Sequence, residues 1–99
     1  QTCALPILSL RPDIVFVGVN GVSAGFGLST PDPEEAAVKD AIVRAARRVI
    51  VLADSSKFQQ ESLVSFAALD AVDVLVTDRA PQGELADALA ADGVEVWSA

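Results

Sequence analysis

The sequence contains no histidine and only one cysteine, Cys3. A conventional zinc site draws its ligands from several cysteine and histidine residues, so we expect no metal here. A single cysteine cannot form a disulfide within the chain, which agrees with a cytoplasmic protein.

Basic residues are also scarce: lysine and arginine number 7 against 14 acidic residues, for a net charge of −7. Binding to a nucleic-acid backbone needs clustered basic side chains, so this stretch alone should not bind DNA. No apolar run approaches the ~20 residues that a membrane-spanning helix needs. We therefore expect no direct nucleic-acid or membrane partner.

Methionine is absent altogether, so the chain as given has no initiator residue. Residues 1–7 (QTCALPI) resemble the translation of a common sequencing adapter, and such segments are excluded from fold reasoning. We therefore expect the chain to be the C-terminal part of a longer protein. The alternative is a natural N-terminus that has lost its methionine.

What remains is a chain of 99 residues, 52% of them hydrophobic, which suits one small folded domain. Short apolar runs without polar alternation predict strands covered on both faces. Helices are predicted between them, one starting at the Asp32 cap and Pro33 and running to Arg47, the other covering 81–91 with Gly93 as its stop. The predicted strands are 13–19, 49–53, 73–77 and 94–97.

This order of elements predicts an α/β fold: a parallel sheet with right-handed crossovers in a Rossmann-like arrangement of three layers. Helical spacing in the first helix turns Val38, Ala41 and Ile42 toward the sheet and Lys39 outward. Residues 59–71 give no clear assignment.

Polar residues follow three of the predicted strands. Asn20 opens a stretch with Gly21 and Gly25, the sequence Asp54-Ser55-Ser56-Lys57 ends the second strand, and Asp78 ends the third. The carboxyl ends of parallel strands share one edge, where ligands bind in open α/β sheets. The Lys57 ammonium beside the Ser55 hydroxyl suits a small anion. Two plainer alternatives stand: Asp54 and Ser55 cap a helix, and the glycine-rich stretch is a surface loop.

The chain resembles the C-terminal sensor domain of DeoR-family bacterial transcription regulators. The similar segments occur in the same order along the chain, and they begin at Asp13, Gly27, Glu35, Val51, Val74 and Gly93. The resemblance implies a fold similar to ribose-5-phosphate isomerase and CoA transferases, and a phosphorylated sugar or related metabolite as effector.

By the same resemblance, Asn20, Gly21 and Gly25 belong to one ligand loop, Lys57 faces the anionic part of the effector, and Asp54 and Asp78 shape the rim. Residues 8–99 would then form the C-terminal part of the sensor domain. The winged helix-turn-helix and the phosphate-holding first part of the sensor are missing. Operator DNA would be bound only through that missing domain, by a homo-oligomer of the full-length protein.

An enzyme fragment of the isomerase or deaminase type is a second possibility. Isomerases of this fold carry an acidic cluster after the first strand, whereas residues 18–22 here contain no carboxylate. The position of their basic glutamate falls on Lys39, and an ammonium cannot act as that base near neutral pH. We therefore predict a sensor without catalytic residues or cofactor. A nucleotide-binding Rossmann domain is a third possibility, but residues 20–27 do not match its glycine fingerprint.

Overall fold

The structure, a computed structural model, describes residues 11–99. The segment that resembles a translated adapter, residues 1–7 with Cys3, lies outside the described residues. Within 11–99 the elements are, in chain order, β1 (Ile14–Gly18), β2 (Gly21–Ser23), β3 (Gly27–Thr30), α2 (Pro33–Ala45), β4 (Arg48–Leu52), the 3₁₀ turn η1 (Ser55–Lys57), β5 (Val64–Ala67), the 3₁₀ turn η2 (Leu69–Ala71), β6 (Val74–Thr77), α3 (Gly83–Ala91) and β7 (Glu95–Ser98).

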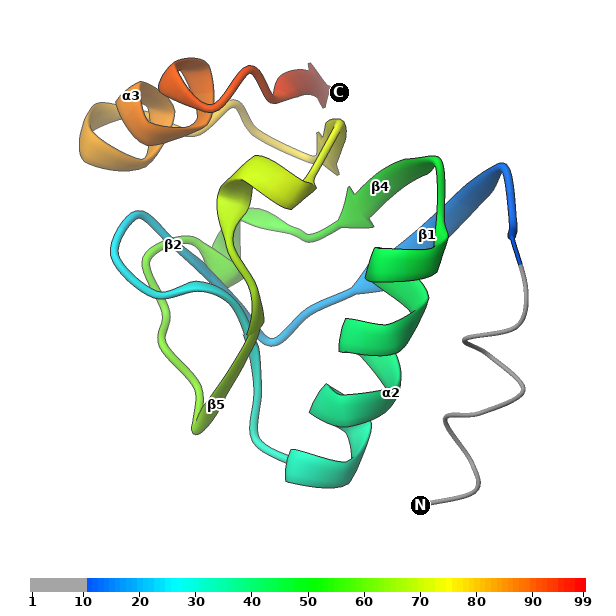
Figure 1. Cartoon of the computed structure of the whole chain (residues 1–99). Coiled ribbons are helices and arrows are strands. Elements are labelled where there is room, and N and C mark those ends of the chain that lie inside the picture. Colours follow the sequence, from blue (N-terminus) through cyan, green and yellow to red (C-terminus); the bar gives the residue numbers. More distant parts are fainter. Residues whose placement is uncertain (1–10) are drawn as a thin grey trace.

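Four of these strands form a parallel sheet in the order β1-β4-β6-β7. They coincide with the four apolar runs of the sequence, which confirms the predicted α/β, Rossmann-like fold. Strands that follow one another along the chain are therefore neighbours in this sheet, and one crossover connection joins each pair. Figure 1 shows the two crossover helices, α2 beside β1 and α3 near the C-terminus.

The glycine-rich stretch is not a surface loop. It forms the hairpin β2–β3, which pairs with β5 in a second, antiparallel sheet of order β2-β3-β5. Every residue of both hairpin strands is buried. Glycine is needed for this close packing: Gly27 has φ of 74°, and a Cβ there would lie 2.3 Å from the Ala67 carbonyl oxygen.

Helix α2 begins where the sequence predicts, with Asp32 as its N-cap. The Asp32 Oδ1 accepts a hydrogen bond from the Glu34 N–H at 3.0 Å. The helix ends at Ala45, two residues before the predicted end. Helix α3 ends at Ala91, and Gly93 follows it with φ of 73°, as expected of a helix stop.

A single core lies between one face of the parallel sheet and the elements that connect its strands. The antiparallel sheet and both helices contribute to it. Its members include Val17, Val49, Val51 and Leu75 from the parallel sheet, Val22, Leu28 and Phe66 from the antiparallel sheet, and Leu85 and Leu89 from α3.

The sequence predicted that the strand within 13–19 is buried on both faces, and this prediction is wrong: the other described residues cover only one face of β1. Phe16 is 67% exposed and Ile14 is 49% exposed, because β1 is an edge strand and one face of it meets no other described element. Among residues 11–99 no helix combines the length and apolar character that crossing a membrane requires.

Candidate functional site

Three of the predicted site residues lie at one edge of the parallel sheet. Gly18 pairs with Leu52, and Leu52 pairs with Val76, at the ends of neighbouring strands. Asn20, Asp54 and Asp78 each follow two residues beyond these positions. The structure therefore places all three at the carboxyl edge, where open α/β sheets bind ligands.

Asp54 organises the turn that follows β4. It is the N-cap of η1, and its Oδ1 accepts hydrogen bonds from the Ser56 N–H at 2.9 Å and from the Ser56 hydroxyl. The Ser56 hydroxyl and then its N–H lower the pKa of Asp54, and the nearby Lys57 charge lowers it further. The capping alternative is confirmed for this residue.

Asp78 fastens the same turn to the end of β6. Its Oδ1 accepts the Ser55 N–H at 2.7 Å, and its Oδ2 accepts the Ser55 hydroxyl at 3.3 Å. Donation from the Ser55 N–H is the main cause that lowers the pKa of Asp78, and the Ser55 and Thr77 hydroxyls lower it as well. Both carboxylates of the site are therefore ionised at neutral pH and already engaged by hydrogen-bond donors of the protein.

We call these two hydrogen bonds between Ser55 and Asp78 the latch. A cleft of about 540 Å³ lies beside it. Of its lining residues, the sequence analysis named only Ser55 and Asp78, and it missed the cation Arg79, which directly follows Asp78. The only available signal was its place after the polar end of a strand. The cleft is lined by Ser55, Phe58, Asp78, Arg79, Ala80, Gln82 and Ala99.

Lys57 and Arg79 are the cations of the segments that follow β4 and β6. Within residues 11–99 neither forms a salt bridge. Lys57 is half-buried and lies outside the cleft lining, whereas Arg79 is exposed within it. Because the Ser55 and Ser56 hydroxyls already donate to the two carboxylates, the two cations are the groups left to meet a negatively charged molecule.

The chain after Lys57 is fixed to the hairpin. Phe58 forms an isolated bridge with Val22, and the Gln59 N–H donates to the Val22 carbonyl at 2.6 Å. Gln59 has φ of 57°, uncommon for a residue other than glycine, and its Oε1 accepts the Ala24 N–H at 2.9 Å. The segment after the turn is thus held by hydrogen bonds to the hairpin β2–β3, whose strands are buried.

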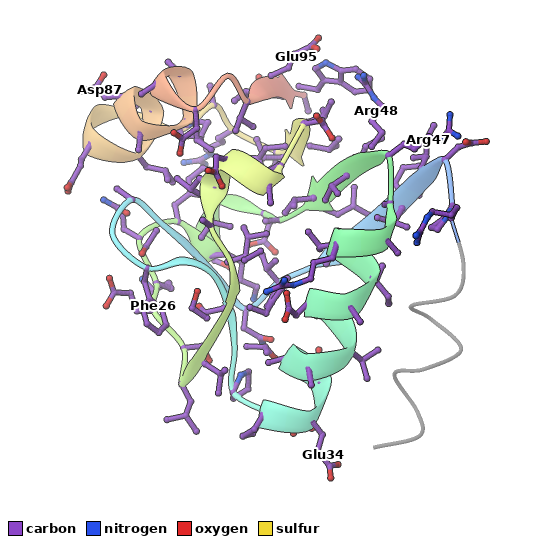
Figure 2. The ribbon with its side chains drawn as sticks, viewed as in Figure 1. Phe26, Glu34, Arg47, Arg48, Asp87 and Glu95 are labelled. Atoms are coloured by element: carbon purple, nitrogen blue, oxygen red, sulfur yellow. The ribbon has the colours of Figure 1, made fainter. Side chains whose placement is uncertain are left out.

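The glycines of the predicted ligand loop do not meet at the cleft. Gly21 is packed against Gln60, whose carbonyl oxygen would lie 2.2 Å from an added Cβ. Gly25 is exposed in the hairpin loop and lines a separate hollow of about 370 Å³, with Phe26, Ser65 and Asp92 among its other residues. Figure 2 shows Phe26 on that hairpin.

Lys39 does not point outward as predicted. Its Nζ lies 2.6 Å from the Gly18 carbonyl oxygen and 2.7 Å from the Glu35 Oε2, and 5.5 Å from the centre of the Phe66 ring. The long aliphatic stem allows a residue on the side of the helix to reach inward. At the position of the isomerase base, the fold therefore holds an ammonium bound to the end of β1.

Residues 11–99 contain no group of three cysteine, aspartate or glutamate side chains arranged to hold a metal ion. One cation, Arg79, lines the cleft, and a second, Lys57, lies on the adjoining turn. Such cations are suited to binding an anion.

Comparison with known proteins identifies the family. Residues 5–79 match the model of the DeoR C-terminal sensor domain. The HTH-type transcriptional regulator GlpR of Haloferax volcanii is 34% identical over 84 residues, which are 85% of this chain and 33% of that protein. The transcriptional repressor GlcR of Bacillus subtilis is 36% identical over 88 residues, 89% of this chain and 34% of that protein.

The glycerol-3-phosphate regulon repressor of Escherichia coli is 31% identical over 75 residues, 76% of this chain and 30% of the repressor. The chain thus spans about a third of the length of these curated relatives. It belongs to the family of DeoR C-terminal sensor domains, which are domains of transcription regulators and not enzymes.

Proposed function

We propose that this chain is the effector-binding portion of a cytoplasmic, DNA-binding transcription regulator, and that its effector is a phosphorylated sugar or a related anionic metabolite. Residues 8–99 would be the C-terminal part of the sensor domain. Operator DNA would be bound by a winged helix-turn-helix elsewhere in the protein, which acts as a homo-oligomer.

One observation carries the proposal: the carboxylates at the edge of the sheet are engaged, and the cations are not. Asp54 and Asp78 accept their hydrogen bonds from Ser56 and Ser55, while Lys57 and Arg79 have no salt-bridge partner within residues 11–99. The oxygens of a phosphate group would accept hydrogen bonds from both cations.

The name of one relative supports this class of ligand: it is a repressor of the glycerol-3-phosphate regulon. Sugar hydroxyls would find partners in the serine hydroxyls and the Gln82 amide beside the cleft.

Effector binding and operator binding would be linked. An effector that prefers one arrangement of the sensor subunits shifts the protein toward it, and that arrangement binds operator with a different affinity. By the same linkage, operator DNA must change the affinity for effector by the same factor.

The test uses the full-length protein. Sugar and polyol phosphates, glycerol 3-phosphate among them, are screened by thermal shift, because a ligand that binds only the native state raises the melting temperature. AMP and NAD serve as negative controls. Operator affinity is then measured with and without the ligand that shifts the protein.

Two substitutions test the assignment of the cations. We expect Lys57→Ala and Arg79→Ala each to weaken effector binding by about tenfold or more, since a hydrogen bond to a charged group contributes roughly 1.5–3 kcal/mol. Operator binding without effector should be unchanged. Arg44→Ala, which removes an exposed arginine on α2, is the matched control. Unchanged effector binding in both cleft variants would refute the assignment.

A further inference from the structure

One face of the parallel sheet carries several large apolar side chains that the described residues leave exposed. In each pair of neighbouring strands, residues in register point to the same side of the sheet. Phe16, Ile50, Val74 and Glu95 form one row, and Gly18, Leu52, Val76 and Trp97 form the next. The apolar residues that point to this side, which we call the open face, are Ile14, Phe16, Ile50, Leu52, Val74, Val76 and Trp97. Ile50 and Val74, in the two middle strands, are nevertheless buried, at 6% and 0% exposed.

None of these seven residues is a member of the core cluster described above or packs against it, although Ile50 and Val74 are themselves buried. The alternate residues of the same strands, such as Val17, Val51 and Leu75, are all core members. On the open face Phe16 is 67% exposed, Trp97 47% and Leu52 45%. Contiguous apolar surface of this kind marks a place where another part of a protein packs.

The direction of winding explains why nothing covers this face. The chain steps from β1 to β4, to β6 and to β7, always toward the same edge of the sheet. Parallel crossovers are right-handed almost without exception, so successive steps in one direction put every connecting segment on the same face. An all-parallel sheet is normally covered on both faces. The second cover must therefore come from outside residues 11–99.

We propose that the open face is covered by an amphipathic helix supplied by the same polypeptide, from the part of the full-length protein outside this chain. The relatives provide the length: about two thirds of each lies outside the match. This step rests on the proposed function in one respect, that the chain is a portion of a longer regulator.

The face defines what such a helix must look like. Charged residues occur on it only at the amino end of the sheet, where Arg48 and Glu95 begin β4 and β7 (Figure 2). The four strands span about 14 Å at about 4.8 Å per neighbour, which about ten helical residues cover at 1.5 Å per residue. A helix with apolar residues at i, i+3, i+4 and i+7 matches a flat apolar surface with a charged end.

A cysteine-accessibility experiment on the full-length protein tests whether the face is covered. On a background without other reactive cysteines, the rate of thiol modification is compared for Phe16→Cys and Leu63→Cys. The two native side chains are equally exposed within residues 11–99, at 67% and 73%, but Leu63 is not on the open face. We expect the cysteine at position 16 to react at least tenfold more slowly. Trp97→Cys provides a second probe should the first variant fail to fold.

A photo-crosslinking amino acid at position 16 identifies the occupant. We expect crosslinks within one polypeptide, to a segment outside residues 11–99, at every protein concentration. Crosslinks between two chains that disappear on dilution, or a position 16 as reactive as position 63, would overturn the inference. Neither readout uses an effector: a protein that shows the intramolecular crosslink but ignores all sugar phosphates would refute the proposed function and leave this inference standing.

Discussion

The hairpin Gly21–Thr30 and the turn Asp54–Lys57 both follow a parallel strand at the same edge of the sheet, but they differ in what their polar groups contact. Hairpin strands β2 and β3 are wholly buried, and their serines bond inward: the Ser29 hydroxyl accepts the Ser62 N–H at 2.9 Å. The turn is half-exposed and keeps an unpaired ammonium, Lys57. We therefore interpret the hairpin as structural support and propose that the turn is the part that contacts a ligand.

The comparison predicts that substitutions in the hairpin change stability, whereas those in the turn change ligand binding. The largest effect is expected for Leu28→Ala. Leu28 is 1% exposed, and removing it leaves a cavity among the core residues of both sheets. We expect the free energy of unfolding to fall by about 3 kcal/mol in urea denaturation.

The matched control is Leu63→Ala, on the segment that leads from the turn to β5. Leu63 is 73% exposed, so its truncation should change the free energy of unfolding by less than about 0.5 kcal/mol. Equal losses for the two leucines would mean that the hairpin is no more a part of the core than the loop beside it.

The next effect concerns the predicted ligand glycines. Gly21→Ala would place a methyl group 2.2 Å from the Gln60 carbonyl oxygen and 2.7 Å from the Ser29 Oγ. We expect a loss of about 2 kcal/mol, in the range of overpacked buried sites. Gly25→Ala meets nothing within 4 Å and should be neutral or slightly stabilising.

Effector binding separates this structural role from the one that the resemblance implies. If Gly21→Ala weakened effector binding without changing the urea midpoint, Gly21 would be a ligand residue, and the contrast between hairpin and turn would be wrong. The same titration on Gly25→Ala supplies the control.

Sequence patterns succeeded where a segment's own residues decide its structure. The apolar runs located all four parallel strands, and Asp32 with Pro33 located the start of α2. The hairpin was missed because its strands are only three and four residues long and rich in glycine and serine. Their burial depends on pairing with β5, more than thirty residues later in the chain, which local pattern does not reveal.

The same limit applies to the site. Strand order was enough to bring Asn20, Asp54 and Asp78 to one edge, because parallel strands end together. It could not show that Gly25 belongs to a different hollow, or that Asp78 bonds to Ser55. Helical periodicity turned Lys39 to solvent, but periodicity places a Cβ and does not follow a four-carbon stem back to Gly18.

The smallest expected effect is the pH dependence of the latch between Asp78 and Ser55. Hydrogen bonds from Ser55 lower the pKa of Asp78 in the folded state. The latch is therefore fully formed above the ordinary aspartate pKa of about 3.9, and its contribution is lost as pH falls through the lower, folded-state pKa. Asp78→Asn keeps an oxygen that can accept the Ser55 N–H but removes the titration.

We expect the urea midpoint of the native protein to fall more steeply than that of Asp78→Asn as pH drops from about 6 to about 3, a range that spans the ordinary aspartate pKa. Asp87→Asn, at an exposed α3 position with no hydrogen-bond partner among the described residues, should follow the native curve. Parallel curves for the native protein and Asp78→Asn would mean that the carboxylate charge does not hold the turn. In that case the turn would become ordered only when the effector binds. The turn would then differ from the hairpin in rigidity as well as in exposure.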